Sequence, residues 1–565
     1  YVLVLAFATC GFGIWYRVPN FGGPDEYSRL MQPLKVAGRV GADPGLDSLV
    51  AGVTDGRALG ATFYLYGAVL APVFLAVVVT GQVGDFLALG SIQSRWTLWH
   101  WTATVVLGRL VNVALGVGCV YLTYRLGTEL RDRFAGRLAA LFLALSVGFV
   151  SQAHLVGEDV PMLFFLLLSV AVAHRYVETG RTRTFLLGSV AGGLAIAFKL
   201  TGGVGAILLG IAHVDRARRQ ENTLDALLRP TVLASGLVVG FLTVYIGIPS
   251  ALVGGPTELI VRVSSTLGSK TGRSGGLTAP IWYWVARGYV AGLGLPLTVA
   301  TAVGVVGTAV GWVRKPDWSA HPLAVLLVGS VVVPLAVFAR WEFVRIRHLV
   351  PTYPALLILL GTATARWWDR DRAQRGLKVA LAVVLVTTGA FVAAAEAQYV
   401  TDPRDDATAW IASNTDDSAT VEVYENSIAD VGVPHGRETS HYPFRENAAA
   451  NTSTLVLNES AYTEWMLALP ERRPEYVQLT GTELSYLDPR DPRSEQFPTR
   501  RRHIRRLLAG EYDYRVAVTF GTRPDYADRS LGERLVRAGV YPRVVGVEQV
   551  VIVLERTDLG NTTGR

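Results

Sequence analysis

Apolar runs recur from Tyr1 to about Val400, and many of them approach the roughly 20 residues that cross a bilayer as a helix. Within lipid every backbone polar group must be satisfied by the protein itself, so runs of this kind are confined to membrane-spanning helices. From Thr401 onward the chain has the polarity of a soluble protein. We therefore expect a polytopic α-helical membrane domain over residues 1–400 and a C-terminal soluble domain over residues 401–565.

Charge is distributed unevenly along the 565 residues, whose net charge is +7. Residues 401–565 hold 26 Asp and Glu against 20 Arg and no Lys, so the excess of basic residues belongs to the membrane half. Basic residues in short loops between membrane helices determine the orientation of a membrane protein. We therefore attribute the basic charge to membrane topology and expect no nucleic-acid partner. The only two cysteines, Cys10 and Cys119, lie within apolar runs and indicate neither a disulfide framework nor a thiol site.

The positive-inside rule orients the helices. The cytoplasmic face is assigned to the basic clusters Arg125–Arg137, Arg175–Arg183, Arg216–Arg219, Arg314–Lys315 and Arg366–Lys378. With a first helix over Tyr1–Tyr16, spans are expected at 103–124, 138–156, 160–174, 184–198, 200–214, 231–248, 287–313, 321–339, 347–365 and 378–397. This gives about 11 transmembrane helices, and the odd number places the C-terminal domain outside the cytoplasm.

Ala61–Thr80 is also apolar enough to span. If it did, a further crossing would have to lie in 82–101. We interpret the segment instead as an interfacial or re-entrant piece, because all five basic clusters then fall on the cytoplasmic face.

Two pairs of adjacent carboxylates lie on the predicted extracytoplasmic face. Asp25 and Glu26 follow the first helix, and Glu158 and Asp159 lie between two apolar runs. Neighbouring carboxylates near a low-dielectric region perturb each other's pKa, which suits a general base. Pro, Asp and Glu are also ordinary residues of a first helical turn, so each pair is equally compatible with a structural role.

Cations occur on the same face, where the positive-inside rule disfavours them. Lys199 stands within some thirty nearly uncharged residues, and Arg345, Arg347 and His348 follow Arg340 in a short turn. Arg and His can hold a phosphate by charge-assisted hydrogen bonds. The structural alternatives are snorkelling of Lys199 and contact of the arginines with lipid headgroups.

Taken in order, these segments resemble the multi-spanning glycosyltransferases of the GT-C superfamily, particularly the protein O-mannosyltransferase and aminoarabinose transferase branch. The resemblance covers roughly residues 1–400 and rests on the ordered set rather than on one specific motif. The set comprises the Asp25-Glu26 pair, Tyr121-Leu122-Thr123-Tyr124-Arg125-Leu126-Gly127, Leu138–Leu145, Glu158-Asp159-Val160-Pro161, Gly188–Lys199 and Arg347-His348-Leu349-Val350-Pro351.

The resemblance implies transfer of a sugar from a polyprenyl (dolichyl-type) phosphate to an acceptor hydroxyl on the extracytoplasmic face, with inversion. Asp25 would be the general base with Glu26 beside it, and Glu158 and Asp159 would lie near the sugar. Lys199, Arg345, Arg347 and His348 would hold the lipid phosphate. Metal dependence stays open, and the ligands of a divalent metal would come from Asp25, Glu158 and Asp159.

The C-terminal region alternates helix-like and strand-like segments, which favours a small α/β domain. Helices are expected at 405–413, 494–509 and 531–538, and strands at 419–424, 454–457, 514–520 and 544–554. Asn451, Asn458 and Asn561 begin glycosylation triplets. We expect this domain to bind the acceptor, which can be a protein, glycan or lipid, or to have a structural role.

A transporter or flippase of a lipid-linked or anionic substrate is the alternative function. Transporters are typically built from internal repeats with charges or broken helices near the middle of the membrane. This chain has no convincing repeat, and its unusual charges gather at one surface. The enzymatic interpretation therefore requires that Asp25, Lys199 and Arg347 lie together.

Overall fold

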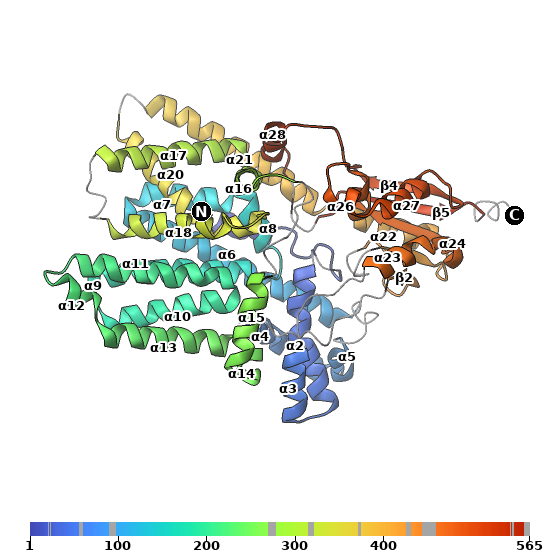
Figure 1. Cartoon of the computed structure of the whole chain (residues 1–565), viewed down its shortest axis with the longest axis horizontal. Helices are drawn as coiled ribbons and strands as arrows, with labels where there is room; N and C mark the ends of the chain where they lie inside the picture. The colour runs from blue at the N-terminus through green and yellow to red at the C-terminus, as the bar shows by residue number, and fades with distance from the viewer. Residues whose placement is uncertain are drawn as a thin grey trace.

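The computed structural model describes residues 1–20, 22, 24–55, 60–89, 98–268, 278–314, 321–370, 374–424, 431–442, 459–542, 544 and 547–558. Most of the described chain is helical. Long helices lie side by side in a bundle, and a small sheet with its own helices is attached to one end (Figure 1). The expected strand at 454–457 and the asparagines of the three glycosylation triplets lie outside the described residues.

The bundle is built from apolar helices whose inward faces form one large buried cluster. Its members are α1 (Val2–Gly11), α6 (Trp99–Leu130), α7 (Arg133–Ala144) with α8 (Val147–Ala153), α9 (Asp159–Thr179), α10 (Thr182–Phe198), α11 (Val204–Arg218), α13 (Pro230–Gly247), α17 (Leu295–Arg314), α18 (Pro322–Phe338), α20 (Tyr353–Trp368) and α21 (Gln374–Tyr399). Glycine allows the closest crossings: a Cβ at Gly136 of α7 would come within 2.4 Å of Tyr124 O of α6.

By length and composition, six helices among the described residues can cross a membrane, and two bent helix pairs would raise the number to eight. Three shorter apolar helices are α1, α10 and α18. Several helices of this kind indicate an integral membrane protein.

Two expected spans are broken. The segment 138–156 contains α7 and α8, which meet at 65°, and 287–313 contains the end of α16 (Ile281–Leu293) and α17, which meet at 112°. Gly294 separates α16 from α17 with φ +78°, a conformation that glycine adopts without steric cost. Pro296 then occupies the first turn of α17, where its missing N–H costs nothing.

We call the end of the bundle where α9 begins and α10 ends the charged end. The helices α2 (Pro24–Ala42), α3 (Leu46–Asp55), α4 (Thr62–Val79), α5 (Val83–Ala88), α14 (Pro249–Gly254) and α15 (Pro256–Gly268) lie at this end. The short segments α19 (Ile346–Leu349) and η4 (Val350–Thr352) lead into α20 there, and η2 (Leu200–Gly203) joins α10 to α11. At the opposite end, α12 (Thr223–Leu227) connects α11 to α13.

Residues 61–80 form the single apolar helix α4, whose contacts define its course. Tyr66, near its start, bonds to Asn112 of α6 and to Gly157 just before α9. Gln82, just after its end, accepts a hydrogen bond from Trp99, the first residue of α6, at 2.6 Å. Helix α4 therefore runs beside the part of α6 that precedes Asn112.

The C-terminal part contains a five-stranded sheet in the order β2-β1-β3-β5-β4. Strand β1 (Val421–Val423) is parallel to β2 (Thr439–His441) and β3 (Tyr476–Thr480), whereas β5 (Val550–Arg556) is antiparallel to β3 and β4 (Tyr514–Gly521). The helices of this part are α22 (Pro403–Asn414), α23 (Glu459–Leu467), α24 (Leu469–Arg472), α25 (Gly481–Leu484), α26 (Pro492–Gln496), α27 (Pro498–Leu508) and α28 (Leu531–Val540).

Strand β5, which lies between β3 and β4, is apolar from Val550 to Leu554, and both of its faces are covered there. Val550, Ile552 and Leu554 belong to one buried cluster, and Val551 and Val553 belong to another. The expected helices at 405–413 and 531–538 correspond to α22 and α28, and the expected strand at 514–520 corresponds to β4. Pro498 divides the expected helix 494–509 into α26 and α27.

A buried ionic contact joins the two parts of the molecule. Arg17, just after α1, lies 3.5 Å from Asp402 and 3.3 Å from Asp405, which stand at the start of α22. Asp402 also pairs with Arg404 at 2.7 Å and accepts a hydrogen bond from Glu548 N at 3.2 Å. The sheet is thereby attached to the segment that leads from α1 to Asp25.

Candidate functional site

Six charged side chains meet at the charged end of the bundle. Arg347 donates to Asp25, and Arg29 donates to Glu158. Lys199 Nζ lies 2.7 Å from Asp159 Oδ1 and 3.2 Å from Glu158 Oε1. We call this group the charged cluster, and it consists of Asp25, Arg29, Glu158, Asp159, Lys199 and Arg347.

Helix ends supply these side chains. Asp25 lies in the first turn of α2 and Asp159 in the first turn of α9, where the helix dipole favours negative charge. Lys199 follows the last residue of α10, and its extended backbone, with φ −157°, separates α10 from η2. Arg347 belongs to the short helix α19. Helix ends can therefore gather charges from distant parts of the sequence without placing them in the middle of the bundle.

The carboxylates differ in exposure and in pKa. The Asp25 side chain is 60% exposed, whereas Glu158 is 24% and Asp159 is 9% exposed. Burial alone would raise the pKa of Glu158, but Arg29 and Lys199 outweigh it and lower that pKa to about 2. Burial likewise opposes ionisation of Asp25, yet Arg347 leaves its pKa below the ordinary value. Asp25 is thus an ionised and accessible carboxylate.

Glu26 points away from the charged cluster into a buried ion pair. Its two carboxylate oxygens each lie 2.7 Å from Arg109 nitrogens, and the two side chains are 1% and 0% exposed. The same carboxylate accepts hydrogen bonds from Gly22 N at 2.8 Å and Val156 N at 3.1 Å. Glu26 therefore connects the segment before Asp25 to the segment before Glu158.

The turn before Glu158 has further support. Gly157 N donates to the Tyr66 hydroxyl at 2.9 Å, and the Asn112 amide donates to Leu155 O. These contacts come from α4 and α6, which are remote from the turn in sequence. They fix the backbone from which Glu158 and Asp159 project.

Arg345 and His348 belong to the same short turn as Arg347 but have different surroundings. Arg345 N donates to His348 Nδ1 at 3.1 Å, and the Arg345 guanidinium lies 5.8 Å from the centre of the Phe343 ring. His348 is buried and contacts the Trp341 ring edge-on at 5.1 Å. These contacts lie within the turn, whereas Arg347 reaches Asp25.

Two cations of this region, Arg29 and Arg109, are not among the residues predicted from the sequence. Arg29 follows Asp25 by four residues, a spacing that places both on one helix face and could have identified it. Arg109 is a cation within the apolar run 103–124, and a charge at membrane depth is a signal in itself.

The cluster retains capacity for an anionic ligand. The Nε atoms of Arg29 and Arg347 are buried and have no hydrogen-bond partner among the described residues. An unpaired buried donor is costly, so an incoming phosphate oxygen would be favoured at these atoms.

The carboxylates do not match a metal site in this arrangement. Among the described residues, no group of three or more His, Cys, Asp or Glu side chains is placed to hold an ion. Asp25, Glu158 and Asp159 are each bonded to a cationic side chain instead. We assign no step to a metal.

An apolar cavity of about 620 Å³ adjoins the cluster. Phe198, the neighbour of Lys199, lines it together with Leu194 of α10, and Val239 and Leu242 of α13 form the other side. Tyr64 and Leu65 near the start of α4 also line it, and the Tyr64 hydroxyl donates to Ile246 O at 2.9 Å. The lining is apolar and fits a hydrocarbon chain, and no residue of the charged cluster lines the cavity.

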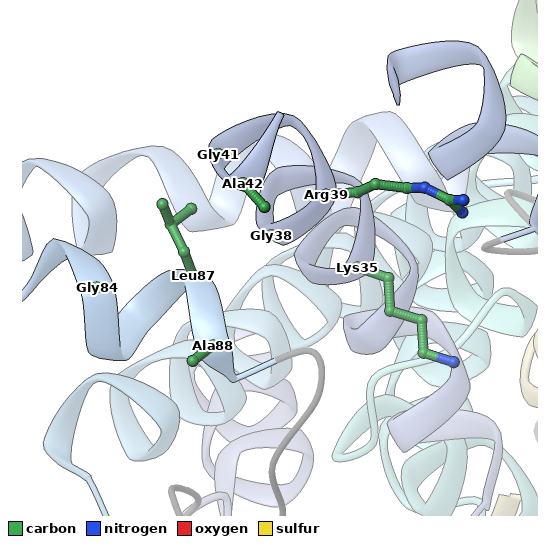
Figure 2. Close-up of a pocket in the computed structure, with 8 residues that line it drawn as sticks. All are labelled: Lys35, Gly38, Arg39, Gly41, Ala42, Gly84, Leu87 and Ala88. Carbon is green, nitrogen blue, oxygen red and sulfur yellow. The ribbon is translucent and has the colours of Figure 1, made fainter. Parts of the chain in front are cut away.

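A second cavity, of about 500 Å³, lies between α2 and α5 (Figure 2). Lys35 and Arg39 extend from α2, whereas Leu87 and Ala88 come from α5. None of the cluster residues lines this cavity.

Comparison with known families supports the resemblance read from the sequence. The family model for dolichyl-phosphate-mannose-protein mannosyltransferases matches residues 100–244. This segment is roughly a quarter of the chain and includes Glu158, Asp159 and Lys199 but not Asp25 or Arg347. The predicted resemblance to GT-C glycosyltransferases is confirmed over these residues.

Two solved structures that resemble the chain are distant from it in sequence. The apo oligosaccharyltransferase of Archaeoglobus fulgidus is 13% identical, with a TM-score of 0.49 over 98% of this chain and 88% of that chain. ArnT from Cupriavidus metallidurans bound to undecaprenyl phosphate is 12% identical, with a TM-score of 0.48 over 86% and 93%. No curated protein sequence matches the chain.

Proposed function

We propose that this chain is a membrane glycosyltransferase that moves a sugar from a polyprenyl phosphate to an acceptor hydroxyl on the extracytoplasmic face. The observation that carries the proposal is the charged cluster, in which residues from four distant segments meet around an accessible carboxylate. Two of its arginines have an Nε atom without a hydrogen-bond partner in the described part of the chain. The family match over residues 100–244 supports the same reaction class.

The proposed topology has eleven crossings: α1, α6, the α7–α8 pair, α9, α10, α11, α13, α17, α18, α20 and α21. Helix α4 is not among them, because Gln82 after its end contacts Trp99 at the start of α6. An odd number of crossings puts the C-terminal domain, residues 401–565, on the same face as the charged cluster. The membrane domain comprises residues 1–400.

In the proposed reaction, Asp25 accepts the proton of the acceptor hydroxyl, and the oxygen attacks the anomeric carbon. The bond from that carbon to the phosphate oxygen breaks at the same time, and its electron pair leaves with the phosphate. A single displacement of this kind inverts the anomeric centre. Asp25 suits the role because it is ionised and is the most exposed carboxylate of the cluster.

Cations stabilise the charge that develops on the leaving phosphate. Arg347 bonds to Asp25 through Nη1 and keeps Nε for the phosphate, and Arg29 also has a free Nε. Lys199 lies next to Phe198 at the apolar cavity, which would receive the first part of the polyprenyl chain. Glu158 and Asp159 orient Lys199 and lie where the sugar hydroxyls would bind.

The remaining sequence-based assignments have different proposed roles. Arg345 and His348 shape the turn that presents Arg347, in accord with the bond between them. Glu26 positions the two acidic turns through Arg109 and the backbone of Gly22 and Val156.

The test is transfer of labelled sugar from a panel of polyprenyl-phosphate sugars by the purified chain in lipid nanodiscs. Replacement of the general base, Asp25→Asn, should reduce transfer roughly 100- to 10,000-fold. The Asp25 side chain is largely exposed, so the melting temperature should stay close to that of the parent. Asp47→Asn, which changes an exposed carboxylate in α3, is the matched control and should transfer normally.

If the Asp25→Asn variant and the parent transferred sugar equally well, Asp25 would not be the general base. A parent that moves the lipid-linked sugar between leaflets but never forms a glycosylated acceptor would instead establish the transporter function.

A further inference from the structure

Helix α28 leaves the sheet region and docks on the bundle (Figure 1). Leu531 and Leu535 pack against the large buried cluster of the bundle. Gly539 faces α16 and α17, and a Cβ there would lie 2.5 Å from Val290 and 2.8 Å from Leu295. The close approach at Gly539 makes this docking specific, since any larger residue would force the helix away.

Helix α28 docks at the end of α17 where the outward face of α17 begins. Val299, Val303, Val306 and Val310 are 43–61% exposed and recur every three or four residues, so they form one stripe. In a helix that crosses a bilayer, such an exposed apolar stripe faces lipid. Leu295 lies one turn before Val299, and α28 therefore sits where this stripe begins.

One edge of the outward side of α28 carries exposed apolar and aromatic side chains. Val536 and Val540, four residues apart, are each 51% exposed, and Tyr541 is 62% exposed. An exposed aliphatic pair with a tyrosine is unusual for a water-facing helix but typical of one that lies at the bilayer interface.

Three arginines lie on or near α28. Arg534 and Arg537 belong to α28, and Arg287 of α16 is close enough to Arg534 for the two charges to repel. None of the three is in an ion pair within the described part of the chain. The Arg537 guanidinium lies 5.4 Å from the centre of the Tyr541 ring. Asp525 attracts Arg537 but already pairs with Arg529, so the three arginines are complementary to anions outside the chain.

We propose that α28 is an interfacial anchor that binds anionic lipid headgroups and thereby holds the C-terminal part against the bilayer. Val536, Val540 and Tyr541 enter the headgroup region, and Arg534, Arg537 and Arg287 contact lipid phosphates. The lipid surface is the occupant because the patch continues the lipid-facing stripe of α17 and has complementary charge. This inference depends on α17 crossing the membrane and not on sugar transfer.

The test uses a nitroxide spin label at Val540→Cys in full-length protein, in nanodiscs of phosphatidylcholine with increasing phosphatidylglycerol. The native Cys10 and Cys119 are fully buried and are replaced by alanine in all samples. Asp417→Cys, at a fully exposed side chain of the sheet region, is the water-facing control. The label at position 540 should collide more with oxygen than with a polar nickel chelate, and the label at position 417 should show the reverse.

A larger phosphatidylglycerol fraction should move the label at position 540 deeper into the bilayer. Arg534→Gln and Arg537→Gln should each raise the phosphatidylglycerol fraction needed for this shift by about 5-fold. Collision rates at position 540 equal to those at position 417 in every lipid mixture would overturn the proposal. Shielding of position 540 from both oxygen and nickel would also overturn it, because a protein partner would then cover the patch.

Discussion

Asp25 and Glu26 are adjacent in sequence but have opposite surroundings. The Asp25 side chain is 60% exposed and paired with Arg347, whereas Glu26 is 1% exposed and paired with Arg109. Successive residues of a helix point in directions about 100° apart, so one can face the site while the other faces the core. The acidic pair is therefore one accessible carboxylate and one structural carboxylate rather than two coupled acids.

Removal of the Glu26 charge should destabilise the protein strongly. Glu26→Gln leaves the buried Arg109 without a counter-charge, and breaking a buried pair of this kind costs about 3–5 kcal/mol. The melting temperature in detergent or nanodiscs measures the loss. The double variant Glu26→Leu with Arg109→Leu should recover much of it, because neither charge then remains buried. A single variant as stable as the parent would contradict the positioning role.

Glu158 should make stability depend on acid pH. Its pKa is lowered from 4.5 to about 2 in the folded protein, so the native state is stabilised above about pH 4.5 and loses this contribution as pH falls toward 2. Glu158→Gln should therefore lower the melting temperature more at pH 7 than at pH 3. Glu129→Gln, in an exposed pair at the opposite end, is the control and should change little at either pH. A Glu158→Gln effect of the same size at both pH values would contradict the assignment.

Among the elements, the junctions between helices determine the site more than the helices themselves. Asp25 and Asp159 belong to first turns, Lys199 to the break between α10 and η2, and Arg347 to the short helix α19. The long apolar helices between these junctions bring the junctions to the same end of the bundle. Helix α4 is apolar like its neighbours. Tyr66 near its start bonds to Gly157, and Gln82 just after its end bonds to Trp99, so α4 lies beyond the charged end of the bundle.

The course of α4 can be tested by labelling. Thr80→Cys, at the exposed end of α4, should react with a membrane-impermeant thiol reagent from the same side as Asp417→Cys in the sheet region. Arg218→Cys, at the end of α11, should react only from the other side. Sealed vesicles of known orientation give the readout. Reaction of Thr80→Cys from the side of position 218 would mean that α4 crosses the membrane.

At the scale of the whole molecule, the sheet region and the charged cluster share one end of the bundle. The contact with Asp402 attaches the sheet region to Arg17, which precedes Asp25 by only eight residues. Helix α28 provides a second attachment on the perimeter, against α16 and α17 (Figure 1). Two attachments on different sides restrain the rotation of the C-terminal part over the site.

The Arg17 contact should be essential for this attachment. Asp402 has a fully buried side chain, so Asp402→Asn leaves Arg17 and Arg404 poorly compensated and should cost about 3–5 kcal/mol. Limited proteolysis near residue 401, together with the melting temperature, measures the effect. Asp405→Asn is the matched control: its side chain is 35% exposed, and the loss should be smaller. Equal behaviour of the two variants would contradict a specific role for Asp402.

The sequence by itself determined that the chain has several apolar helices of near-bilayer length, and it named the candidates Asp25, Glu158, Asp159, Lys199 and Arg347. Apolar runs of near-bilayer length and charges at their ends are local signals, because the cost of placing polar groups in lipid acts on each segment separately. The breaks at Ser146 and Gly294 and the course of α4 depended on neighbouring helices, so hydropathy alone placed continuous spans where the chain bends.

Only the tertiary structure decided which charges meet. Asp25 and Arg347 are separated by more than 300 residues, and nothing local links Glu26 to Arg109 or Arg29 to Glu158. Pairing of buried charges lowers their desolvation cost, but the partner is chosen by the packing of whole helices. The sequence could therefore name the charged residues, whereas only the fold could separate the exposed carboxylate from the buried one.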